Sequence, residues 1–134
     1  MNRKQIKEKL ESEYPIADEV SFNDFNIEDK LKQQLQLELK YYDLWINSKY
    51  VYNKIEDILI DKQCELYDFY RFEFERNLSK TEIELYYLPK HKDIKIIKNK
   101  MELQDVKVHF FDICYRSVKQ MTWNIQAYLK NREG

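Results

Sequence analysis

Residues 27–77 read IEDKLKQQLQLELKYYDLWINSKYVYNKIEDILIDKQCELYDFYRFEFERN and contain neither glycine nor proline. Glycine supplies the positive φ angles of tight hairpin turns and proline ends helices, so this stretch lacks the usual turn and stop signals. Apolar side chains recur in it at steps of four and three, at Leu31, Leu35, Leu39, Tyr42 and Ile46. That spacing places them on one face of a helix, and we expect a long helix over residues 27–77.

The same scarcity of glycine and proline extends over the rest of the chain. The one glycine of the 134 residues is Gly134, and the only prolines are Pro15 and Pro89. Glycine-rich phosphate loops, and most catalytic sites built on glycine turns, are therefore disfavoured. A chain of this length suits a single domain, residues 1–134, with a real core. We expect an all-α protein with two long helices and a short N-terminal helix.

The shorter segments are expected to flank and connect the long helices. Residues 1–25 form an N-terminal arm, in which residues 3–13 fit a charged helix that ends before Pro15 and in which Phe22 and Phe25 dock. Asn26 fits the N-cap of the long helix, with Asp29 as its capping partner. Residues 78–97 form a connector in which polar and apolar residues alternate, and either a small hairpin within 82–97 or short helical turns would fit.

A second long helix is expected over residues 98–131, and it carries two apolar stripes. One consists of Met101, Val108, Phe111, Tyr115, Val118 and Ile125. The other consists of Leu103, Val106, Phe110, Cys114, Met121 and Tyr128. A surface helix of a monomer needs only one such stripe. Because the chain offers few elements to cover two, we expect the first stripe to line an interface between identical subunits.

Charge is unevenly distributed along a chain whose net charge is −1. Residues 11–30 carry seven acids and one lysine, and residues 56–84 carry nine acids and four bases. Residues 90–100 instead carry five lysines against one aspartate. A basic segment of this kind can form a local anion-binding surface even in a neutral protein. The alternative is a solvated loop and helix start.

Aromatic residues make up 15% of the chain, and one cluster of them is interleaved with arginines over residues 67–76. Proteins that bind single-stranded nucleic acid stack bases on such rings and pair phosphates with the cations. Packing in the core of a helical oligomer is the alternative. The candidate stacking residues are Tyr70 and Phe72, and the candidate phosphate contacts are Arg71, Arg76, Lys90, Lys92, Lys95 and Lys98.

No catalytic or metal-binding residue is assigned. His109 and Cys114 are close in sequence, but five residues apart on a helix they do not face each other. No set of histidines and cysteines has the spacing of a metal site, so we expect no enzyme activity and no cofactor. No signal peptide is visible and no apolar run approaches the ~20 residues of a membrane span, so an intracellular protein with free thiols is expected.

Several segments agree in order and spacing with one known family. They are Tyr42-Asp43-Leu44-Trp45-Ile46-Asn47, Arg71-Phe72-Glu73-Phe74, Lys92-Asp93-Ile94, Phe111-Asp112-Ile113-Cys114 and Trp123-Asn124-Ile125-Gln126-Ala127. Through them residues 25–130 resemble the UvsY family of recombination mediators of T-even-type phages. Arg71 matches an arginine of the family's DNA-binding stretch, whereas Phe69 stands where that stretch has a lysine and Asn77-Leu78-Ser79 replaces its glycine-rich part.

The resemblance implies a protein without catalytic activity that binds single-stranded DNA and forms a closed homo-oligomeric ring. It further implies that the protein loads a phage RecA-like recombinase onto the strand by displacing the phage single-strand-binding protein, in the cytoplasm of the infected host. The residues alone leave two other classes open. One is a helical inhibitor or adaptor that binds a protein through the acidic residues 56–84, and the other is a purely structural assembly protein.

Overall fold

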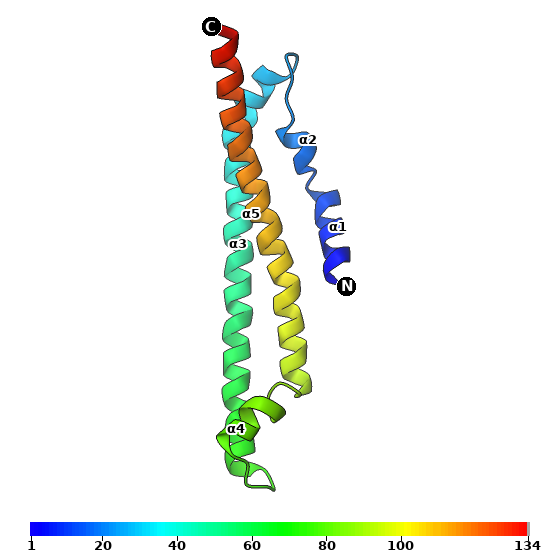
Figure 1. Ribbon diagram of the computed structural model, residues 1–134, viewed down its shortest axis with the longest axis vertical. Coiled ribbons are helices and arrows are strands. Elements are labelled where there is room, and N and C mark those ends of the chain that lie inside the picture. The colour runs from blue at the N-terminus through cyan, green and yellow to red at the C-terminus, as the bar shows by residue number, and fades with distance from the viewer. Residues whose placement is uncertain (134) are drawn as a thin grey trace. The chain divides into compact units, whose positions relative to one another are not determined.

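The computed structural model describes residues 1–133 and is built from helices (Figure 1). In chain order the elements are α1 (Arg3–Glu13), α2 (Ile16–Val20), α3 (Ile27–Asp68), the π-helical turn η1 (Phe69–Glu73), α4 (Lys80–Glu82), the π-helical turn η2 (Ile83–Tyr87) and α5 (Lys92–Glu133). Residues 1–133 contain no strand, so the all-α prediction is confirmed, together with its two long helices and the N-terminal helix over residues 3–13.

Two compact units divide the chain. Unit 1 consists of residues 1–49 and the chain from Val106 onward, and unit 2 consists of residues 50–105. Both long helices, α3 and α5, contribute residues to each unit. The single domain expected from the sequence stays a prediction.

The connector differs from the hairpin that the alternating pattern suggested. Residues 82–87 lie in α4 and η2, residues 88–91 form the turn that follows, and residues 92–97 begin α5. The hairpin is therefore wrong, and the alternative of short helical turns is confirmed. A capping box begins this helical segment, because the Ser79 hydroxyl accepts from the Glu82 amide at 3.2 Å and the Glu82 carboxylate accepts from the Ser79 amide at 3.2 Å. The long helices end elsewhere than predicted, since η1 stops at Glu73 and α5 already begins at Lys92.

The cap before α3 lies one turn earlier than predicted. The Asn23 side chain accepts from the amides of Phe25 (2.9 Å) and Asn26 (3.0 Å), and the Asn26 side chain accepts from the Asn23 amide at 2.7 Å. These reciprocal bonds form a capping box between Asn23 and Asn26. The predicted cap from Asn26 to Asp29 is therefore wrong, because the Asn26 side chain is already paired with Asn23.

Unit 1 packs the N-terminal arm and the start of α3 onto α5. The Tyr14 ring, at the end of α1, meets the Phe111 ring of α5 at 5.1 Å and the Tyr41 ring of α3 at 6.3 Å. Tyr41 is fully buried, and its hydroxyl donates to the carboxylate of Glu19. Of the two phenylalanines expected to dock the arm, Phe22 packs on Tyr128 at 6.0 Å, whereas Phe25 is exposed.

The residues assigned to a subunit interface are largely used inside the chain. Phe111, Val118 and Ile125 are buried, so they leave almost no surface for a second subunit. Tyr115 is half-buried under the rings of Tyr42 and Trp45, at 5.5 and 5.9 Å. Met101 and Val108 are half-buried as well, and Met101 packs against the core of unit 2. The N-terminal arm covers part of α5, through Tyr14 on Phe111 and Phe22 on Tyr128, and a subunit interface is not needed to bury these residues.

The apolar face of α3 shows the opposite pattern. Its stripe, which we call the α3 stripe, is exposed along its whole length, to 65% at Leu35, and consists of Leu31, Leu35, Leu39, Tyr42 and Ile46. Apolar side chains spaced on one face of a helix form a contiguous surface. Large contiguous apolar surfaces of this kind are uncommon on monomeric proteins.

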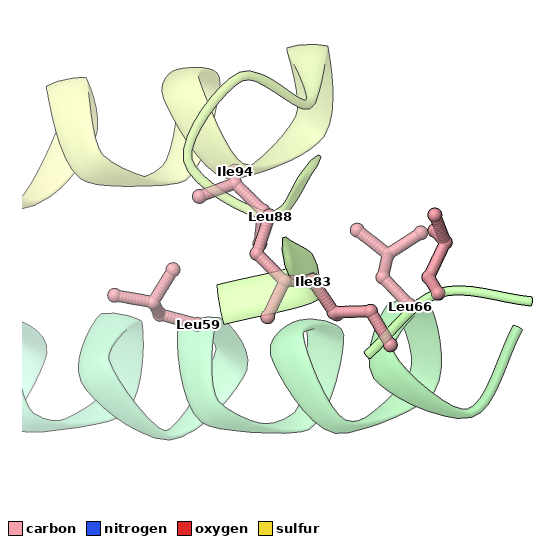
Figure 2. Close-up of a cluster of buried hydrophobic side chains, with 6 residues drawn as sticks. Leu59, Leu66, Ile83, Leu88 and Ile94 are labelled. Atoms are coloured by element: carbon pink, nitrogen blue, oxygen red, sulfur yellow. The ribbon is translucent and has the colours of Figure 1, made fainter. Parts of the chain in front are cut away.

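Unit 2 has a core of its own, formed by Leu59, Leu66, Leu78, Ile83, Leu88 and Ile94. Ile83 of η2 is fully buried and lies between the two long helices, where α3 supplies Leu59 and Leu66 and α5 supplies Ile94 (Figure 2). This cluster fixes η2 and the start of α5 against the end of α3. The candidate site is built on these three segments.

Within residues 1–133, none of the helices combines the length and apolarity that a bilayer crossing requires.

Candidate nucleic-acid interface

Two π-helical turns carry the aromatic residues of the site. In η2 the Leu88 amide donates to the Ile83 carbonyl at 2.9 Å, which is the i→i+5 bond of a π turn. Such turns are rare and occur frequently at functional sites, because the extra residue per turn redirects side chains. Here η1 supplies Tyr70, and η2 supplies Tyr86 and Tyr87.

Tyr70 is at the centre of a cluster of rings. Its ring centroid lies 5.4 Å from that of Phe74, 5.2 Å from that of Tyr87 and 6.4 Å from that of His91. Phe74 and Tyr87 are also in contact, at 5.7 Å. Edge-to-face packing of this kind holds aromatic rings in fixed orientations. The cluster therefore forms a rigid base beneath the surface of unit 2.

An open cavity of about 660 Å³ lies beside this cluster, and its lining is aromatic and basic. Its lining residues are Tyr70, Tyr86, Tyr87, Lys90, His91 and Lys92. The volume falls within the range of small-ligand sites, and the combination of rings and ammonium groups suits a planar group that carries negative charge. The Lys90 ammonium lies 5.8 Å from the centre of the Tyr86 ring.

His91 orients the basic side of the cavity. Its Nδ1 accepts from the Asp93 amide at 3.1 Å, and its carbonyl accepts from the Lys95 amide at 3.0 Å, so it caps the start of α5. The Asp93 carboxylate in turn lies 3.4 Å from the ammonium of Lys62 on α3. The hydrogen bond to Asp93 is the main reason why the pKa of Lys62 is raised. These contacts hold the backbone from which the Lys90 and Lys92 side chains project.

The structure brings three of the predicted DNA-binding residues together, namely Tyr70, Lys90 and Lys92, all in the lining of this cavity. It places the others elsewhere. Lys98 lines two other hollows of unit 2, and Lys95 is exposed on α5.

The two arginines and Phe72 lie outside the cavity lining. The Arg71 guanidinium donates to the Leu78 carbonyl at 2.8 Å and so holds the loop 74–79. Arg76 is exposed in that loop, and Phe72 is 78% exposed. The main role of Arg71 in this structure is therefore to fix the loop, although its charge stays at the surface.

Sequence reasoning missed half of the cavity lining: Tyr86, Tyr87 and His91. The signal was present, because a pair of tyrosines stands three residues before the segment Lys90-His91-Lys92. It was overlooked because the alternation around it fitted a hairpin as well as helical turns, and the sequence did not decide between them. In a strand, Tyr86 and Tyr87 would point to opposite faces, whereas the π turn lets both line one cavity.

The residues set aside as catalytic candidates do not converge. Cys114 is fully buried in unit 1, and burial raises the pKa of its thiol to about 12, while His109 is exposed on the same helix. Cys64 is a second free thiol, exposed on α3. In the described part of the chain, no three His, Cys, Asp or Glu side chains are grouped so that they could hold a metal ion.

Comparisons with protein-family models, with curated proteins and with solved structures found no match to this chain. The resemblance to the UvsY family therefore stays a prediction from the sequence.

Proposed function

We propose that this protein binds single-stranded DNA and acts as a recombination mediator that loads a RecA-like recombinase by displacing a single-strand-binding protein. The observation that carries the DNA-binding part is the cavity of unit 2, where three tyrosines, two lysines and a histidine line one open hollow. The mediator part, the phage partners and the cytoplasm of an infected host come from the family resemblance. No catalytic step is part of the proposal.

The chemistry of the cavity suits a single strand better than a duplex. Bases of a single strand are free to stack on an exposed ring such as Tyr86, and each stacked base contributes about 1–3 kcal/mol whatever its identity. The flanking phosphates then meet Lys90 and Lys92, and unit 2 has further exposed cations at Lys95 and Arg76. In a duplex the bases face each other, so only the weaker phosphate contacts remain.

Self-assembly would turn one weak site into a strong one. The α3 stripe supports association with a further copy, because its five apolar side chains are 37% to 65% exposed. When identical sites are linked in a ring, a strand held at one site meets the next at high effective concentration. A strand wrapped in this way is a poorer substrate for a competing single-strand-binding protein.

Fluorescence anisotropy of a labelled oligo(dT), titrated with the full chain at low and moderate salt, tests the proposal. We expect saturable binding that weakens steeply with salt, together with weaker binding to a duplex of the same length. Sedimentation run on the same samples establishes that the protein is folded and assembled. Absence of binding at low salt by folded, assembled protein would overturn the DNA-binding function.

A helical protein-interaction function is the second candidate, because the α3 stripe could equally receive a helix of another protein. The acidic residues 56–84, which belong to unit 2, are the surface that the sequence offers such a partner. This candidate predicts no affinity for DNA at low salt, so the same titration separates the two functions.

A further inference from the structure

The turn before α3 presents an aromatic side chain that nothing in the chain covers. Phe25 is 97% exposed, although large apolar side chains are usually the first to be buried. The capping box between Asn23 and Asn26 fixes the backbone on both sides of it. Three exposed acids, Asp24, Glu28 and Asp29, surround it in sequence. The turn is thus a rigid, acidic projection that carries an apolar tip.

A groove with the opposite character lies elsewhere in unit 1, between α1 and α5. It measures about 350 Å³ and is lined by Arg3, Lys4, Lys7, Val106, His109, Phe110 and Ile113. The side chains from α5 are mainly apolar, and α1 supplies three cations. Within residues 1–133 these three cations form no ion pair with an acid of the same chain. The groove is therefore an apolar floor with an unpaired basic rim.

The two features match in both shape and charge. An aromatic ring fits an apolar groove of this size, and the acids beside it would meet the basic rim of α1. They cannot meet within one chain, because the turn after α2 and the N-terminal end of α1 lie at opposite ends of the arm (Figure 1). We propose that the Phe25 turn of one copy docks in the α1–α5 groove of a second copy.

This contact is head-to-tail, because it joins two different patches of the same chain. Contacts of this type propagate from copy to copy, and they close into a ring when the rotation between neighbours allows it. The contact rests on the self-assembly part of the proposed function and specifies its chemistry, but it does not depend on DNA binding. The fixed backbone of the turn keeps the ordering cost of docking low.

Two charge-reversed variants test the contact. One is Lys4→Glu with Lys7→Glu, which makes the groove rim acidic, and the other is Asp24→Lys with Glu28→Lys, which makes the turn basic. Each alone places like charges in contact, and we expect each to sediment as monomers at concentrations at which the wild type assembles. Lys107→Glu is the matched control, because this lysine is exposed on α5 and does not line the groove.

Mixing the two variants gives the decisive result. The basic turn of one variant then meets the acidic groove of the other, and the unchanged patches also complement each other, so an equimolar mixture is expected to assemble with alternating subunits. Assembly of either variant alone like the wild type, or failure of the mixture to assemble, would overturn the proposal. A contact between two copies of one patch predicts instead that the variant changed in the other patch assembles like the wild type.

A third variant keeps the test independent of charge. Phe25→Ala removes only an exposed side chain, so the fold is retained, and we expect the dissociation constant of assembly to rise about tenfold or more, as for an aromatic anchor. Anisotropy with oligo(dT) is recorded for every variant. Variants that no longer assemble but still bind DNA at each subunit support the contact. A wild type that assembles but does not bind DNA would overturn only the proposed function. Unchanged assembly of Phe25→Ala would mean that the acidic turn docks on another protein instead.

Discussion

The Tyr70 ring lies 5.2 Å from the Tyr87 ring, and this contact joins the π-helical turn at the end of α3 to the one that precedes α5. The two residues are far apart in sequence, yet both line the cavity, together with Lys90 and Lys92. The cavity therefore exists only when both turns are packed on the core around Ile83. Any binding at this site depends on that packing as well as on the exposed groups.

Replacement of Tyr86 by alanine tests stacking at the cavity. Tyr86 is exposed, so its removal costs little folding free energy. A base stacked there would lose its contact with the tyrosine ring. We expect Tyr86→Ala to weaken oligo(dT) binding by about 1–3 kcal/mol. Leu85→Ala is the matched control, because Leu85 is a similarly exposed neighbour outside the cavity lining. Equal affinities of the two variants in an anisotropy titration would exclude a base on Tyr86.

The two lysines of the cavity are expected to act through phosphates. Each phosphate contact on a single strand contributes about 0.7 to the slope of log K against log salt, so Lys90→Ala with Lys92→Ala should flatten the slope by about 1.4. Lys100→Ala is the control, since Lys100 is exposed on α5 and does not line the cavity. An unchanged slope in the double variant would place the phosphates on another surface.

Arg71 is expected to contribute to stability through its bond to the Leu78 carbonyl at 2.8 Å. Arg71→Lys keeps the charge but not the planar guanidinium, and we expect the free energy of unfolding to fall by about 1 kcal/mol. Arg76 lies in the loop that follows η1 and is exposed, so Arg76→Lys should have no measurable effect. Urea unfolding of both variants compares them directly. Equal stabilities would mean that the Arg71 bond is not formed in solution.

The helices were predictable from the sequence because their signal is local. A stretch without glycine or proline, with apolar residues at steps of three and four, strongly favours a helix. The helices α1, α3 and α5 lie in such stretches. Their ends were less predictable. Residues 69–73 continue as a π turn with no stop signal at Asp68, and the alternation at residues 81–86 is equally compatible with helical turns held by the Ser79–Glu82 capping box.

The pairing of apolar faces could not be derived from periodicity. Both α3 and α5 carry convincing stripes, but a stripe does not say what covers it. The structure buries Phe111 and Val118 of α5 inside the chain and leaves Leu35 of α3 exposed. That outcome depends on where the arm packs, which is a tertiary choice. The cavity is similar, since Lys90 and Lys92 stand out by composition whereas Tyr87 joins them only through the packing of η2.

The buried thiol of Cys114 and the buried phenol of Tyr41, both in unit 1, predict a loss of stability at high pH. Burial raises the pKa of Cys114 to about 12, and burial with the bond to Glu19 raises that of Tyr41. The unfolded thiol ionises near pH 9, so the stabilisation is complete below that pH and is lost as the pH rises toward 12. We expect the free energy of unfolding to fall by at most about 1.4 kcal/mol per pH unit for the thiol.

Urea unfolding between pH 8 and pH 11, under reducing conditions, measures this dependence. Cys114→Ala is less stable overall but should lose less stability over the same interval, because the contribution of the buried thiol is then absent. Cys64→Ala, which removes the exposed thiol, should keep the full wild-type dependence. A pH profile that is equally steep in wild type and in Cys114→Ala would contradict burial of the neutral thiol.

The α3 stripe predicts which exposed apolar residues matter for assembly. Leu35 and Leu39 are more than half exposed, so Leu35→Ser with Leu39→Ser should leave the fold of the chain intact and remove apolar contact only where a second copy covers it. We expect the double variant to sediment at lower mass than the wild type. Ile58→Ser with Ile60→Ser is the matched control, because these two residues are comparably exposed on α3 but lie in unit 2, outside the stripe. If both double variants assembled like the wild type, the stripe would not be part of a contact between copies. That result would favour the protein-interaction function over the recombination-mediator function. If only the stripe variant fell apart while still binding oligo(dT) weakly, avidity within the assembly would account for the lost affinity, since the cavity itself would be unchanged.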